Sequence, residues 1–138
     1  MPSASSNYES GNVTEYLASG AITANGFVKY GTVDSTTGNP TVVECSAITD
    51  VAIGVSLNTV ASGAMCQVQT AGVAKVRATA AAITALDQVM CGASGRCVTA
   101  AGATAVSQGI AETGAAGTVD EVIPVRLAVP NLKGPANS

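Results

Sequence analysis

The chain has 138 residues, of which 47% are hydrophobic, 11% charged and 3% aromatic, and it contains no Trp and no His. This length suits one domain, and the hydrophobic fraction excludes disorder throughout. The charged fraction is less than half the roughly 25% of an average soluble domain, so we expect neighbours to cover part of the surface. The net charge of −3 and the scattered basic residues argue against nucleic acid or an anionic membrane as a partner.

The sequence also lacks the features of an exported protein. Its first residues have neither a basic start nor an apolar segment, so we expect no signal peptide. No apolar run approaches the roughly 20 residues that span a bilayer. The four cysteines are too few and too scattered for a secreted disulfide scaffold, which favours synthesis in a reducing cytosol.

The two ends differ in composition from the middle of the chain. Residues 1–12 are rich in Ser and Asn without apolar periodicity and predict an extended N-terminal arm. Residues 130–138 hold two prolines and a glycine and predict an extended C-terminal tail. Residues 13–129 show no linker-like break, so we expect a single β domain between the two extensions.

The central region has the sequence pattern of an all-β protein, because short runs of β-branched residues are separated by the turn residues Gly, Asn and Pro. We expect strands over residues 13–18, 27–30, 41–45, 51–57, 64–70, 73–78 and 123–129. Asn25 and Gly26 predict a type I′ hairpin, since both tolerate positive φ. Gly54 predicts a bulge or a close backbone approach. The Ala-rich residues 78–86 allow a short helix, and residues 99–107 favour irregular structure.

Two short motifs recur along the chain. The Ala-Ile-Thr-Ala sequence of residues 21–24 returns at residues 82–85, and residues 53–55 are echoed by residues 108–110. In a chain rich in Ala, Thr and Gly, such recurrence is either coincidence or the sign of a duplicated β-unit. Both alternatives stay open at the level of sequence.

Most residues that catalytic or metal chemistry needs are missing. The absence of His removes the commonest general base and metal ligand, and with it any Ser-His or Cys-His nucleophile within one chain. There is no phosphate-binding loop or dinucleotide fingerprint. No Cys or acidic spacing matches a zinc or calcium site. We therefore expect no enzyme, no catalytic residues, no cofactor and no metal site.

Two cysteines flank an expected hairpin tip at residues 92–96. Cys91 and Cys97 could face each other across the strands and oxidise to a disulfide. The alternative is that both are small buried apolar residues, which is common for free Cys. We favour the second interpretation.

The composition favours a subunit that is covered by neighbours. Large aromatic side chains usually dominate core energetics, and this chain has few. Tyr8 and Tyr16 lie in or beside the N-terminal arm, and Tyr is a favoured interface anchor. An extended arm can add a strand to a partner's sheet edge, although plain disorder is the alternative. We expect the partner contacts of the arm at Tyr8, Asn12, Val13, Glu15 and Tyr16.

Several short segments, taken in chain order, resemble one known family. They are residues 21–28 (AITANGFV), 51–55 (VAIGV), 71–76 (AGVAKV), 82–89 (AITALDQV), 108–111 (QGIA) and 123–127 (IPVRL). Over residues 20–129 the pattern resembles the tailed-bacteriophage capsid cement, or head decoration, proteins of the DUF2190 type. One departure is Leu86-Asp87, where that family commonly has Gly-Asp.

The resemblance implies a small β-barrel or β-tulip-like domain that forms homo-oligomers, often trimers. It implies a place on the outer capsid surface, where the oligomers clamp neighbouring subunits of the major capsid protein against internal DNA pressure. It also implies synthesis in the host bacterial cytoplasm and neither enzymatic activity nor a cofactor. An alternative is a carbohydrate- or host-surface-binding β-module displayed on the particle, for which only three tyrosines could supply an aromatic platform.

Overall fold

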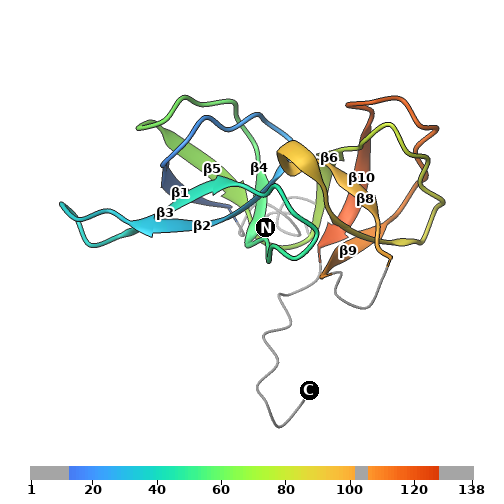
Figure 1. Cartoon of the computed structure of the whole chain (residues 1–138), viewed down its shortest axis with the longest axis horizontal. Helices are drawn as coiled ribbons and strands as arrows, with labels where there is room; N and C mark the ends of the chain where they lie inside the picture. The colour runs from blue at the N-terminus through green and yellow to red at the C-terminus, as the bar shows by residue number, and fades with distance from the viewer. Residues whose placement is uncertain (1–12, 102–105, 128–138) are drawn as a thin grey trace, which may run out of the picture.

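The computed structural model describes residues 13–101 and 106–127, which fold almost entirely into β-strands (Figure 1). This confirms the all-β prediction. The strands and one short 3-10 turn are β1 (Val13–Ala18), β2 (Phe27–Val33), β3 (Pro40–Glu44), β4 (Gly54–Ser56), β5 (Met65–Gln69), β6 (Val73–Arg77), β7 (Gln88–Cys91), η2 (Ala93–Gly95), β8 (Cys97–Thr99), β9 (Ser107–Ala111) and β10 (Val122–Leu127). Among these residues, no helix is long and apolar enough to cross a membrane.

Strands β1 to β5 form a closed barrel, here called the first unit, in the order β1-β3-β2-β4-β5. The β2–β3 hairpin extends from the barrel to one end of the molecule (Figure 1). Its turn spans residues 34–39, which are rich in Thr, Gly and Asn. Pro40 opens β3, a position where its missing N–H costs the ladder little.

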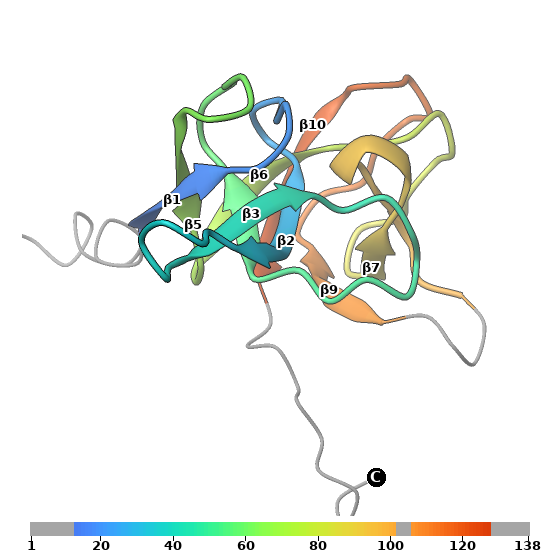
Figure 2. The same ribbon diagram turned by 60° about the vertical axis from the view of Figure 1, so that its left-hand side comes forward.

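Strands β6 to β10 form a second five-stranded sheet, here called the second unit, which lies beside the barrel (Figure 1, Figure 2). Its order is β6-β10-β9-β7-β8. Read from β8 to β6, this order matches β3-β2-β4-β5-β1 around the closed barrel, with β6 to β10 in the places of β1 to β5. A parallel bridge between Ala78 and Cys97 links its two outer strands, as the parallel pairing of β1 with β3 closes the barrel.

The repeat extends to the pairing of single residues. Corresponding cross-strand pairs are Val28–Gly54 and Val89–Gly109, Tyr30–Val42 and Cys91–Cys97, Ile22–Val60 and Ile83–Ala115, and Ala18–Val42 and Ala78–Cys97. The recurring motifs of the sequence therefore occupy equivalent places in two copies of one β-unit. The structure decides between the two alternatives in favour of duplication.

The core follows the same repeat. Six buried residues fill the first barrel, namely Ala18, Ile22, Val28, Val42, Cys66 and Val68. Their counterparts lie in a larger cluster of the second unit, which continues across the junction to Phe27 and Val55 of the first. The larger cluster therefore joins the two units, the smaller one fills the barrel, and both are built mainly from Val, Ala, Ile and Cys.

Two local predictions need correction. Asn25 does adopt positive φ (64°), but no type I′ hairpin follows, because β1 pairs with β5 and β3 and not with β2. Gly26 is needed for another reason: a Cβ there would lie 2.5 Å from the guanidinium of Arg77. Residues 78–86 form no helix, since Ile83 is held in a bridge to Ala115.

Candidate functional site

Strand β1, which carries three of the five predicted contact residues, has one free edge. It pairs with β5 from Val13 to Leu17 but with β3 only at Leu17 and Ala18. Residues 13–16 therefore have a strand partner on one side only, among the residues that the structure describes. An edge of this kind can accept a further strand from another chain.

The predicted contact residues divide between this edge and the undescribed arm. Val13, Glu15 and Tyr16 belong to β1 itself and are part of the barrel. Tyr8 and Asn12 lie outside the described residues. Whether any of the five touches a partner stays a prediction.

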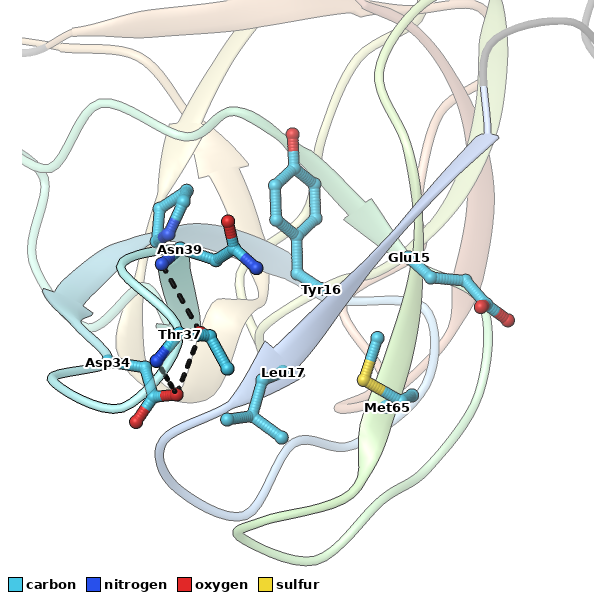
Figure 3. Close-up of a pocket in the computed structure, with 8 residues that line it drawn as sticks. Glu15, Tyr16, Leu17, Asp34, Thr37, Asn39 and Met65 are labelled. Atoms are coloured by element: carbon cyan, nitrogen blue, oxygen red, sulfur yellow. Dashed lines mark hydrogen bonds between the residues drawn. The ribbon is translucent and has the colours of Figure 1, made fainter.

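A pocket of about 380 Å³ lies beside the free edge, between β1 and the β2–β3 hairpin (Figure 3). Leu17, Pro40 and Met65 contribute apolar surface, and Leu17 and Met65 are direct cross-strand partners. The remaining lining residues are Glu15, Tyr16, Asp34, Thr37 and Asn39. Apolar surface with a few polar groups around it is typical of a binding site.

Two tyrosines fix the shape of the barrel end beside this pocket. The rings of Tyr16 and Tyr30 meet edge to face, with centroids 5.8 Å apart and planes at 80°. Their hydroxyl oxygens lie 3.4 Å apart. The hydrogen bond with Tyr30, together with burial, raises the pKa of Tyr16 to about 12. Such aromatic pairs stabilise a fold beyond the area that they bury.

The hairpin side of the pocket is held by its own turn. The Asp34 carboxylate accepts hydrogen bonds from the hydroxyl (2.8 Å) and backbone N–H (3.2 Å) of Thr37. The Thr37 hydroxyl oxygen in turn accepts from the N–H of Asn39 (3.3 Å). These bonds, the hydroxyl bond above all, lower the pKa of Asp34. Local side-chain bonding of this type fixes a turn without help from a partner.

Arg77 holds the junction of the two units, a role that the sequence analysis missed. Its side chain is only 9% exposed. The guanidinium donates to the carbonyl oxygens of Ala24 (2.9 Å) and Ser94 (3.0 Å) and forms ion pairs with Asp120 (3.4 Å) and Glu44 (3.7 Å). In the sequence Arg77 shares a strand face with the exposed Lys75, and no local signal separates the two.

All four cysteines are buried free thiols. Cys91 and Cys97 are direct partners across β7 and β8, as the hairpin predicted. Burial raises the pKa of the Cys97 thiol to about 12 and that of the Cys66 thiol as well. A protonated, buried thiol is a poor nucleophile. The burial of both residues therefore supports the interpretation that they are small apolar core residues, and the absence of a disulfide between them stays a prediction.

No three Cys, Asp or Glu side chains of the described residues come together in a way that could hold a metal ion. A second groove of about 720 Å³ lies between the units and includes Lys75 and the Arg126–Glu112 ion pair. Both hollows combine apolar surface with a few polar groups, which suits binding to another molecule.

Comparison with known proteins gives the class. The model of the phage cement protein family matches residues 8–127, so this chain belongs to that family and is a structural protein of a phage virion. Among solved structures, the N base of the head fiber gp8.5 of bacteriophage phi29 is similar. The TM-score is 0.68 at 16% sequence identity, and the match covers 88% of this chain and 98% of that one. A search of curated proteins found no match.

Proposed function

We propose that this chain is a capsid cement subunit that binds the outer surface of the phage capsid and stabilises the lattice of the major capsid protein. The observation that carries the proposal is the family match over residues 8–127. The low charge, the core of small residues and the free edge of β1 support it, because each suits a protein that works while covered by neighbours.

The proposed mechanism rests on repetition of modest contacts. The subunit acts as a homo-oligomer, which we take to be a trimer, so that each oligomer makes several equivalent contacts with the shell. Each contact buries apolar surface, worth roughly 25 cal/mol per Å² removed from water. Because the contacts of one oligomer are linked, their combined affinity exceeds that of any single one.

We assign the capsid contact to the N-terminal arm and to the edge of β1 that follows it. A strand of the capsid protein would pair along residues 13–16, where β1 has no strand neighbour on its β3 side within residues 13–101 and 106–127. The arm of residues 1–12 would continue that pairing across the capsid surface.

Truncation tests this assignment. Deletion of residues 1–12 should lower the amount of protein that sediments with intact heads, because the arm extends the paired strand, while the melting temperature stays unchanged. The matched control deletes residues 130–138, which should leave binding intact. Unchanged occupancy without residues 1–12 would refute the role of the arm.

A further inference from the structure

Inside the chain, a turn of the first unit occupies one surface of the second unit. Arg77 of β6 donates its backbone N–H to the carbonyl of Asn25 (2.7 Å) and its side-chain Nε–H to that of Ala24 (2.9 Å). In the β7–β8 turn, a Cβ added to Gly95 would lie 2.9 Å from the carbonyl oxygen of Phe27. Residues 24–27 therefore sit between β6 and the β7–β8 turn.

In the first unit, the pocket beside β1 lies at the position that corresponds to the place of residues 24–27 on the second unit. Strand β1 corresponds to β6, and the β2–β3 hairpin corresponds to the β7–β8 hairpin. Leu17 faces Met65 across the strands as Arg77 faces Val122. The second unit fills this position with residues 24–27, and the first unit leaves it as an open pocket of about 380 Å³.

The segment that corresponds to residues 24–27 is residues 85–88 of the second unit. Asn25 and Leu86 are counterparts: both have positive φ, 64° and 74°, and their N–H groups donate to the equivalent carbonyls of Ser56 and Ala111. Whereas Asn25 lies in the junction, Leu86 is 75% exposed. A large apolar side chain that is exposed at a strained backbone position costs free energy of folding. A binding partner that covers this side chain would offset the cost.

The residues around Leu86 repeat this contrast. Phe27 and Val55 pair across β2 and β4 and are completely buried in the junction. Their counterparts, Gln88 and Ile110, pair in the same way across β7 and β9, but both are exposed. The second unit therefore carries an uncovered copy of the surface that joins the two units.

We propose that copies of this chain associate head to tail, with Leu86 of one copy seated in the pocket beside β1 of the next. The contact repeats between molecules the arrangement of the two units within one chain. The β2–β3 hairpin and the loop between β6 and β7 lie at opposite ends of the molecule (Figure 1, Figure 2), so each copy offers one surface and receives the other. This contact is the copy-to-copy interface of the homo-oligomer proposed above, so the inference rests on that part of the proposed function and not on capsid binding. Its anchor lies against Leu17 and Met65, which follow the residues 13–16 that are given to the capsid strand.

Two variants separate the two surfaces. Leu86→Asn removes the anchor while suiting positive φ, and Met65→Glu puts a charge into the pocket at a residue that is 48% exposed. Each should weaken self-association by roughly thirtyfold or more, as loss of an interface anchor does. The matched control is Val119→Asn, at a residue that is 52% exposed and does not line the pocket. Sedimentation velocity gives the mass over a wide range of concentration, and melting curves confirm that each variant is folded.

Mixing the variants gives the decisive result. Each variant alone should be monomeric. In an equal mixture, Leu86 of the Met65→Glu variant can enter the intact pocket of the Leu86→Asn variant, but no further contact can form. The mixture should therefore contain a dimer and nothing larger. A monomeric wild-type chain, two variants of wild-type mass, or a mixture that stays monomeric would overturn the proposal. Should Met65→Glu prove unfolded, Met65→Cys mixed with Leu86→Cys and oxidised glutathione replaces it. Only the mixture should then give a covalent pair, and absence of that pair would count against the contact.

Discussion

Gly54 and Gly109 hold the same position in the two units, and each allows two strands to approach closely. A Cβ on Gly54 would collide with the carbonyl oxygen of Gln69, and a Cβ on Gly109 would collide with that of Arg126. Side chains of Val68 and Val125 close the same space from inside the units. The sequence predicted a close approach at Gly54, and the reason is this contact with backbone that cannot move aside.

Substitution of either glycine by alanine should be costly and by a similar amount. We expect Gly54→Ala and Gly109→Ala each to lower the free energy of unfolding by about 2–3 kcal/mol, because the added methyl group forces two strands apart. Gly20→Ala is the matched control, since nothing lies within 4 Å of its added Cβ. Chemical denaturation measures all three, and a loss at Gly20 equal to that at Gly54 would contradict the steric explanation.

Because of Tyr16, the stability of this end of the barrel should depend on pH in the alkaline range. Its pKa in the folded state, about 12, lies above the ordinary value of about 10. Because the folded value is the higher one, the stabilisation is complete below about pH 10 and is lost as the pH rises through about 12. Spectroscopic titration of the phenols should therefore show a late-titrating tyrosine that Tyr16→Phe removes. If Tyr16→Phe removes a tyrosine that titrates at the ordinary value, the hydrogen bond to Tyr30 is not formed.

At the scale of elements, alternation and turn residues predicted most strands, including β1 with its observed bounds. The buried face of β10, with Ile123 and Val125 inward, follows from the period of two. Strand β9 ends at Ala111 for a chemical reason: Glu112 donates its N–H to the carbonyl of Pro124 (2.9 Å), and Pro124 has no N–H to donate in return. Pairing partners were less predictable, because Asn25-Gly26 has the local chemistry of a hairpin and a tertiary contact gives it another role.

The candidate site shows the same division between local and long-range information. The turn at residues 34–39 and the bounds of β1 could be predicted from the sequence. The pocket between them could not, since β1 and β3 meet through a parallel pairing that no local pattern encodes. Arg77 was missed because its four partners come from four separate segments of the chain, at residues 24, 44, 94 and 120.

Arg77 should be the most sensitive charged position of the described residues. Replacement by lysine keeps the charge but cannot reproduce the forked hydrogen bonds to the partly buried carbonyl groups of Ala24 and Ser94. We expect Arg77→Lys to cost about 3 kcal/mol of unfolding free energy. Arg126→Lys is the control, because the Arg126 side chain is 61% exposed and its ion pair with Glu112 should be worth less than about 1 kcal/mol. Equal losses for the two variants would contradict a joining role for Arg77.

At the scale of the whole molecule, duplication explains how a chain with few large side chains builds a stable fold. Each unit fills its interior with six small or branched residues, and Phe27 and Val55 add a second apolar layer where the units meet. The recurring Ala-Ile-Thr-Ala motif pointed to this arrangement but did not establish it, because four common residues can recur by chance in such a composition. In the structure the two copies of the motif occupy equivalent positions, because Ile22 pairs with Val60 as Ile83 pairs with Ala115.

The central claim is that this chain stabilises a phage capsid, and the heat resistance of the shell tests it most directly. Heads that lack the protein are mixed with the purified chain, and the temperature at which they release their DNA is compared with that of untreated heads. We predict that the chain binds to saturation and raises this temperature, with an effect that grows with occupancy. Saturated binding that leaves the release temperature unchanged, or no binding at all, would contradict the assignment as a cement protein.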